Sequence, residues 1–189
     1  METKEPLISI FTATYNRASL LTNLYQSLKN QTSHNIEWLI VDDGSTDNTE
    51  IIIENIQKNN KNLFPIRYYQ KTNGGKHTAI NVGIRKAKGD LFFIVDSDDL
   101  LTLDAVSTIT SNWQKIHSIN ICGISYLKGY IHDPNKSLGH MYSKLSSFIG
   151  NYIDVRYNRG VSGEDHAEIF RTEYLRQYPF TEYPNERFM

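Results

Sequence analysis

Two hydrophobic periods alternate along the first half of the chain. Short apolar runs rich in β-branched residues predict buried strands at Leu7–Thr14, Trp38–Val41, Ile66–Gln70 and Leu91–Val95. Apolar residues at helical spacing lie between and after these runs. They predict a helix that starts near Leu20 and ends near Asn30, and a second helix that is capped by Thr46 or Asp47 and carries Ile52, Ile53 and Ile56. Two further helices are predicted over 77–88 and 104–117. Strands that alternate with helices predict an α/β fold of Rossmann-like type, in which helices flank a central, mostly parallel sheet.

The pattern changes after residue 120. Ile121–Ile131 predicts one long strand, and a turn is expected at 133–135. The following stretch is rich in Ser, Tyr and Gly and has weak periodicity, so this C-terminal region is expected to be less regular. His166–Arg171 predicts a further strand and Thr172–Gln177 a short helix.

Composition excludes several classes of protein. The 189 residues suit a single domain over 1–189, and 20 Lys and Arg against 21 Asp and Glu argue against a nucleic-acid partner. The lone Cys122 excludes an internal disulfide and a cysteine zinc cluster, and its apolar neighbours predict a buried thiol. Neither a signal peptide nor a membrane span is expected, which favours the cytoplasm; the oligomeric state stays open.

Polar clusters follow all four strands of the first half, and in such sheets ligands bind beyond the carboxyl ends of the strands. The sharpest is Asp96-Ser97-Asp98-Asp99, whose three carboxylates follow an apolar strand. Carboxylates this close repel one another unless a cation or strong hydrogen-bond donors compensate. Mg²⁺ or Mn²⁺ bound together with phosphate oxygens is the natural partner, although a solvated loop that caps the next helix is equally compatible.

The other three clusters are weaker signals when each is taken alone. In Asp42–Asp47 a carboxylate at a strand end can accept hydrogen bonds from a ribose or a base edge, and an ordinary turn with a good N-cap is the alternative. In Thr12–Arg17 small residues let a ring approach the backbone, Tyr15 can stack on it, and Arg17 can meet phosphate. In Asn73–His77 glycines before a helix, with Lys76, suit an anion. Together these clusters match the needs of a nucleoside diphosphate.

The ordered set resembles the GT-A-fold glycosyltransferases of the large inverting family 2. The matching segments, which lie within about residues 6–105, are Ile8-Ser9-Ile10 before Thr14-Tyr15-Asn16, then Val41-Asp42-Asp43-Gly44-Ser45 with Asp47, then Asn73, Gly75, Ala79, Asn81, Gly83, Ala87 and Gly89 of a spaced Asn/Gly/Ala pattern, and Asp96-Ser97-Asp98-Asp99 as the DxD-type motif. The resemblance implies transfer of a sugar from a nucleoside diphosphate donor to a carbohydrate or lipid-linked acceptor, with inversion and with Mn²⁺ or Mg²⁺. It also implies work in the cytoplasm, at the face of the cytoplasmic membrane.

The resemblance also implies roles for individual residues. Those that would hold the nucleoside are Thr12, Ala13, Tyr15 and Asp42, and those that would face the base or phosphates are Lys76 and Arg17. Asp96 and Asp98 would bind the donor ribose and the metal, with Asp98 the better metal ligand and Ser97 between them in the donor site. The metal would neutralise the departing diphosphate.

The catalytic base fits the family pattern least well. A carboxylate must deprotonate the acceptor hydroxyl, and the candidates are Glu186 and Asp165. Family members place a further acid just beyond the position of Glu186, so the acceptor-side half, about 120–189, is expected to be truncated at its C-terminus.

Two other functions stay open at this point. Phe92–Asp99 is similar to the nucleophile motif of haloacid-dehalogenase phosphatases, although three β–α units precede it and Asp99 stands where that motif has Thr. A non-catalytic module that binds a nucleotide or glycan is the other alternative. A dehydrogenase is disfavoured, because no GxGxxG pattern follows the first strand.

Overall fold

The computed structural model describes residues 5–138, 149–151 and 166–183. The chain forms two compact units. The first comprises Met1–Gly123 and Ile169–Met189, and the second comprises Ile124–Glu168. The polar clusters singled out above all lie in the first unit. None of the helices in the described ranges has the length and apolar character that crossing a bilayer requires.

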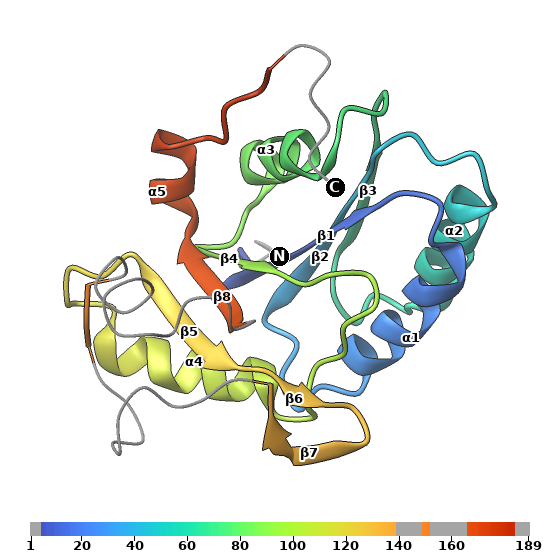
Figure 1. The fold of residues 1–189 in the computed structure, drawn as a ribbon. Helices are drawn as coiled ribbons and strands as arrows, with labels where there is room; N and C mark the ends of the chain where they lie inside the picture. The colour runs from blue at the N-terminus through green and yellow to red at the C-terminus, as the bar shows by residue number, and fades with distance from the viewer. Residues whose placement is uncertain (1–4, 139–148, 152–165, 184–189) are drawn as a thin grey trace. The chain divides into compact units, whose positions relative to one another are not determined.

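The main sheet has six strands in the order β3-β2-β1-β4-β8-β5 (Figure 1). The strands are β1 Ile8–Thr14, β2 Ile36–Asp42, β3 Ile66–Gln70, β4 Leu91–Ile94, β5 Gly123–Leu127 and β8 His166–Arg171. β1 pairs in parallel with β2 and β4, β2 pairs in parallel with β3, and β8 runs antiparallel to β4. The prediction of a mostly parallel sheet is confirmed.

The helices are α1 Ala18–Lys29, α2 Thr49–Asn59, α3 Lys76–Lys86, α4 Ala105–Ile116 and α5 Thr172–Gln177. Figure 1 shows α3 over one face of the sheet and α1 with α2 over the other. Alternate residues of a strand point to opposite faces, so β1 and β2 contribute to two cores. On one face Phe11 packs with Leu39 against Ala79 and Ile84 of α3.

α3 lies unusually close to the sheet, and glycine makes this possible. A Cβ atom on Gly83 would lie 2.3 Å from ring atoms of Phe11, which is fully buried and stacks on Phe92 with ring centroids 5.1 Å apart. Beyond the helix, a Cβ on Gly89 would lie 2.5 Å from the backbone nitrogen of Ser9. Gly83 therefore allows α3 to approach β1, and Gly89 allows the turn after the helix to do the same.

A buried carboxylate joins the amino-terminal ends of the strands. Glu37 is fully buried, and its Oε1 accepts hydrogen bonds from Ser9 Oγ at 2.6 Å and from the Lys88 amide at 2.7 Å. Its Oε2 accepts from Arg67 Nη1 at 2.8 Å. The Glu37 charge thus has partners from three other segments, which offset the cost of burying it.

The second unit corrects part of the expected pattern. In place of one long strand over Ile121–Ile131, β5 ends at Leu127 and β6 Gly129–Tyr130 pairs antiparallel with β7 Asp133–Ser137. β7 begins within the expected turn. The hairpin forms a separate two-stranded sheet. The chain therefore leaves the main sheet after Leu127, where the hydrophobic pattern predicted that the same strand continues.

Cys122 is exposed, so the prediction of a buried thiol is wrong. Cys122 directly precedes β5, which is the last strand of the sheet, and the backbone carbonyl of Cys122 accepts a hydrogen bond from the Arg171 amide at 2.8 Å. The sequence neighbours Ile121 and Gly123 are only half-buried, so the apolar character of this run does not bury its side chains.

We expect Gly83→Ala to lower the free energy of unfolding by about 2 kcal/mol, because the new methyl group overpacks the Phe11 ring. Urea denaturation measures the change. Gly129→Ala is the control, since Gly129 is exposed in β6 and a methyl group there should cost little stability. Equal losses in the two variants would contradict a specific close approach at Gly83.

Glu37→Gln is expected to cost about 2–3 kcal/mol of stability, because it leaves Arg67 without its carboxylate and turns an acceptor into a donor. Glu54→Gln is the matched control. Glu54 is exposed, and among the described residues it pairs with Lys58, one turn away at 3.4 Å, so loss of its charge should cost less than about 0.5 kcal/mol. The same urea titrations report both variants.

Candidate active site

Four polar loops meet at the carboxyl end of the parallel strands. Asp42 of β2 is in register with Thr14 of β1 and with Gln70 of β3. Backbone hydrogen bonds continue past the strand ends, from Asp43 N to Thr14 O and from Lys71 N to Asp42 O, both at 2.9 Å. The loop after β4 joins the same edge, since Val95 N donates to Phe11 O at 2.9 Å. The clusters that the sequence separates by up to 80 residues are therefore neighbours.

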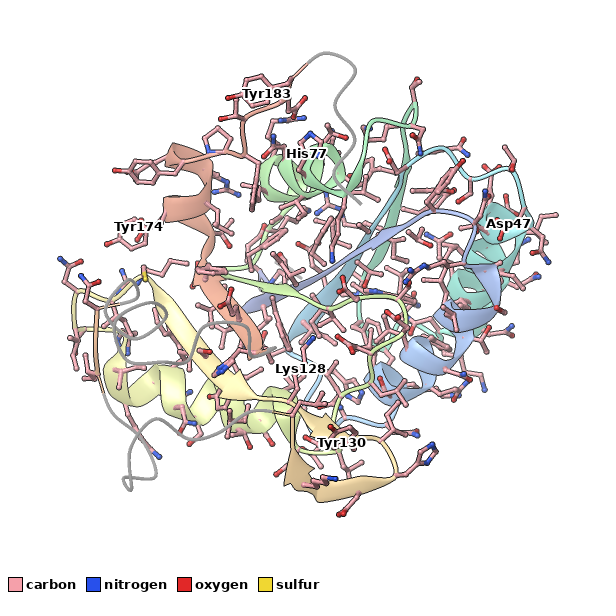
Figure 2. All side chains as sticks on the ribbon, viewed as in Figure 1. Asp47, His77, Lys128, Tyr130, Tyr174 and Tyr183 are labelled. Atoms are coloured by element: carbon pink, nitrogen blue, oxygen red, sulfur yellow. The ribbon has the colours of Figure 1, made fainter. Side chains whose placement is uncertain are left out.

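Asn16 and Asp47 fasten the first loop to the second. Asn16 adopts a left-handed backbone conformation with φ 52°, its amide donates to Ser45 Oγ at 2.8 Å, and its Oδ1 accepts from the Thr46 amide at 2.8 Å. Asp47, which is labelled in Figure 2, accepts hydrogen bonds from the first amide of α1, Ala18 N, at 3.2 Å and from Thr49 N at 3.0 Å. The Thr49 hydroxyl, which also donates to Asp47, holds the pKa of this carboxyl below its usual value.

Asp43 fixes the third loop, a role that its place in the motif does not reveal. Its Oδ1 accepts from Lys71 Nζ at 2.6 Å and from Gly74 N at 3.0 Å, while its Oδ2 accepts from Gly75 N at 2.7 Å. Asp43 is 5% exposed, so these are hydrogen bonds of a nearly buried charge. Gly75 has φ 94° and directly precedes α3, so Asp43 also sets where α3 begins.

Asp42 and Thr12 lie beneath the edge. The Asp42 side chain is fully buried, and it accepts from Ser45 N at 2.7 Å and from the Tyr68 hydroxyl at 2.6 Å. Burial, and secondly the hydrogen bond to Asp42, raise the pKa of the Tyr68 hydroxyl. Thr12 is also fully buried, and its Oγ1 accepts from Trp38 Nε1 at 3.1 Å. Both side chains thus support the loops from below.

The acidic loop after β4 faces two cations from other loops. Lys76 Nζ lies 2.6 Å from Asp96 Oδ1, and Arg17 Nη1 lies 3.4 Å from Asp98 Oδ1. The same Arg17 nitrogen is 3.4 Å from the hydroxyl of Ser97, which is almost completely buried. All four charged side chains of the two ion pairs are between 38% and 57% exposed, so solvent and a ligand can reach them.

The donor set suits a divalent ion that is shared with a phosphate. Among the described residues no three His, Cys, Asp or Glu side chains converge as a metal cage. Asp96 and Asp98 supply two carboxylates, and Mg²⁺ is bound in proteins through one or two carboxylates together with water and substrate phosphates. Asp96 and Asp98 therefore fit a metal that arrives with a diphosphate.

The remaining predicted residues fall into two groups. Tyr15 is 48% exposed and Ala13 is half-buried, so the ring of Tyr15 is open to a ligand at the edge. Glu186 and Asp165, the candidates for the catalytic base, lie outside the described residues.

Asn81 is a second residue whose role the sequence pattern did not disclose. This Asn on α3 is buried; its Nδ2 donates to Phe180 O at 2.8 Å and to Glu182 Oε1 at 2.6 Å, while its Oδ1 accepts from Phe180 N at 2.9 Å. The segment after α5 is thus held against the helix that begins at Lys76. The spacing of Asn81 in the motif was visible, but its partner about 100 residues later was not.

The fold and parts of the sequence are similar to known glycosyltransferases. An uncharacterized glycosyltransferase of Haemophilus influenzae is 40% identical over 99 residues, which are 52% of this chain and 39% of that protein. The GalNAc(5)-diNAcBac-PP-undecaprenol beta-1,3-glucosyltransferase of Campylobacter jejuni is 34% identical over 107 residues, 55% of this chain and 33% of that protein. The chain thus spans well under half the length of these relatives.

Among solved structures, residues 1–349 of S. aureus TarS in complex with UDP share 25% sequence identity and superpose with a TM-score of 0.70. The match covers 90% of this chain and 48% of the TarS chain. The α/β architecture is accordingly the Rossmann-like GT-A fold. The sequence model of the family described as "Glycosyl transferase family 2" matches residues 9–178, and the chain therefore belongs to glycosyl transferase family 2.

Proposed function

We propose that this glycosyltransferase moves a sugar, with inversion, from a nucleoside diphosphate sugar to a carbohydrate or lipid-linked acceptor, assisted by Mn²⁺ or Mg²⁺. The observation that carries the proposal is the pairing of Asp96 with Lys76 and of Asp98 with Arg17 at the mouth of the four loops. Carboxylates for a metal and cations for phosphates thus lie side by side. A diphosphate with its metal needs both kinds of group.

The cations provide the sites for the donor phosphates. Lys76 is the first residue of α3, where the helix dipole favours an anion, and no acidic residue stands in the first turn of this helix. Arg17 comes from the neighbouring loop, and its guanidinium can bind two phosphate oxygens at once. The solved TarS complex contains UDP, which supports a nucleoside diphosphate here.

Asp98 and Asp96 would hold the metal and the donor ribose. When bound, the divalent ion supplies Lewis-acid neutralisation of the diphosphate leaving group. Tyr15 would stack on the base, since its ring is exposed beside the edge. Asp42 and Thr12, together with Ala13, would shape the floor of the nucleoside site from beneath.

The proposed acceptor is inferred from the family and from one relative. The name of the Campylobacter protein includes an undecaprenol diphosphate-linked glycan, which supports a lipid-linked acceptor and work at the cytoplasmic membrane face. Inversion requires a carboxylate base, for which Glu186 and Asp165 remain the candidates. The phosphatase alternative is not favoured, because the chain belongs to family 2.

We expect UDP or GDP with Mn²⁺ to raise the melting temperature and Asp98→Ala to abolish that rise. A ligand at 100 times its dissociation constant adds about 2.7 kcal/mol of stability, which corresponds to a shift of about 5–10 °C for a chain of this size. Differential scanning fluorimetry with a panel of nucleoside diphosphates measures the shift and identifies the base.

Asp90→Ala is the control for this melting experiment. Asp90 is exposed and directly precedes β4, whereas Asp98 lies in the loop that follows it. Asp90→Ala removes one negative charge, as Asp98→Ala does, and should leave the nucleotide-dependent rise in melting temperature intact. The proposal fails if no nucleoside diphosphate with Mn²⁺ shifts the wild-type melting temperature. Donor binding with no transfer or hydrolysis by a C-terminally longer chain would favour the non-catalytic module.

Tyr15→Ala should weaken nucleoside diphosphate binding by about tenfold, since stacking of an aromatic side chain on a base contributes about 1–3 kcal/mol. Tyr15→Phe keeps the ring and is expected to bind like wild type. Isothermal titration calorimetry with Mn²⁺ present separates the two variants. Equal binding by Tyr15→Ala and wild type would remove Tyr15 from the nucleoside site.

A further inference from the structure

Two kinds of ion pair occur at the carboxyl edge of the sheet. Lys71 and Asp43 form a largely buried pair, with side chains 21% and 7% exposed, and two backbone amides also donate to Asp43. The pairs Lys76–Asp96 and Arg17–Asp98 are half-exposed instead. The buried pair is a fixed part of the loop. The exposed pairs contribute little free energy, because water competes for their charged groups.

We infer that Lys76 and Arg17 serve as internal counter-cations of Asp96 and Asp98, which they leave for the donor diphosphate when a divalent metal takes over the carboxylates. The inference rests on the proposed function and adds a second state of the same residues. In the first state each cation blocks one prospective metal ligand. In the second state the same cation binds a phosphate oxygen.

Charge balance supports an exchange of partners. Two carboxylates and two cations sum to zero in the structure as described. A divalent ion and the two negative charges of a sugar nucleotide also sum to zero, so the charges around these four side chains stay balanced only when both arrive together. A metal ion alone would have to displace Lys76 and Arg17 and would leave them without anions. Diphosphate alone would compete with Asp96 and Asp98 for the same cations.

The position of Lys76 means that it has to move only a short distance to exchange its partner. Lys76 begins α3, whose first turn has no acidic residue. The Asp43 carboxylate binds the Gly74 and Gly75 amides just before this turn. α2 differs, since Glu50 stands in its first turn and Asp47 accepts a hydrogen bond from the Thr49 amide. A phosphate bound at the start of α3 would thus meet Lys76 beside the positive end of the helix. Lys76 then needs only a side-chain rotation, because its backbone stays in place.

Removal of one cation should therefore have opposite effects on two equilibria. Lys76→Met frees Asp96, so Mn²⁺ alone should bind about two- to fivefold tighter than to wild type, the range expected for loss of a competing exposed ion pair. The same variant lacks a phosphate ligand, so UDP with saturating Mn²⁺ should bind about tenfold weaker or worse. A residue that only stabilised the fold would not produce both changes.

The experiment measures free Mn²⁺ by electron paramagnetic resonance during titration of the whole chain, and UDP binding by calorimetry at saturating Mn²⁺. Lys76→Arg keeps the charge and should resemble wild type in both titrations. Lys58→Met is the matched control, because Lys58 pairs with Glu54 on an exposed face of α2 and should change neither titration. Arg17→Leu provides a second variant that acts on Asp98.

The outcomes separate this inference from the proposed function. If wild type binds no nucleoside diphosphate at saturating Mn²⁺, the proposed function fails and the inference fails with it. If wild type binds UDP but Lys76→Met and Arg17→Leu bind Mn²⁺ alone no tighter than wild type, the exchange of partners is overturned and the donor site stands. Tighter Mn²⁺ binding together with weaker UDP binding supports the exchange.

Discussion

The candidate site depends most on the hydrogen bonds that the Asp43 carboxylate accepts from the loop after β3. This carboxylate is nearly buried, and it accepts hydrogen bonds from Lys71 Nζ and from the amides of Gly74 and Gly75. These bonds tie the loop after β3 to the end of β2 and fix the residue at which α3 begins. Lys76, the next residue, can therefore reach Asp96 across the edge. A buried charge with several donors holds such a loop more firmly than neutral hydrogen bonds would.

The packing of α3 completes this arrangement. Gly83 allows the helix to approach Phe11, and Asn81 of the same helix binds the backbone of Phe180. One helix thus carries the start of the proposed anion site, a face of the core and an anchor for a distant segment. Substitutions in the middle of α3 should therefore affect the proposed donor site through the position of Lys76, although these residues lie outside that site.

Much of the fold was predictable from hydrophobic periods. The limits of β3, β8 and α5 match the expected ranges Ile66–Gln70, His166–Arg171 and Thr172–Gln177. The prediction was wrong over Ile121–Ile131, because an apolar run does not disclose whether its strand stays in one sheet or turns into a hairpin. The prediction of a buried Cys122 thiol was wrong for a related reason, since burial depends on what packs against a residue in space and not on its neighbours in the sequence.

The sequence by itself determined the fold class, the family and the four clusters at one sheet edge, because each depends on local periodicity or on an ordered motif. Only the tertiary structure decided which groups pair: Arg17 with Asp98, Lys76 with Asp96, and Asp43 with the loop that precedes Lys76. These partners lie 20 to 81 positions apart along the chain. Hydrogen bonds and ion pairs act over a few ångströms in space, so no local pattern in the sequence fixes them.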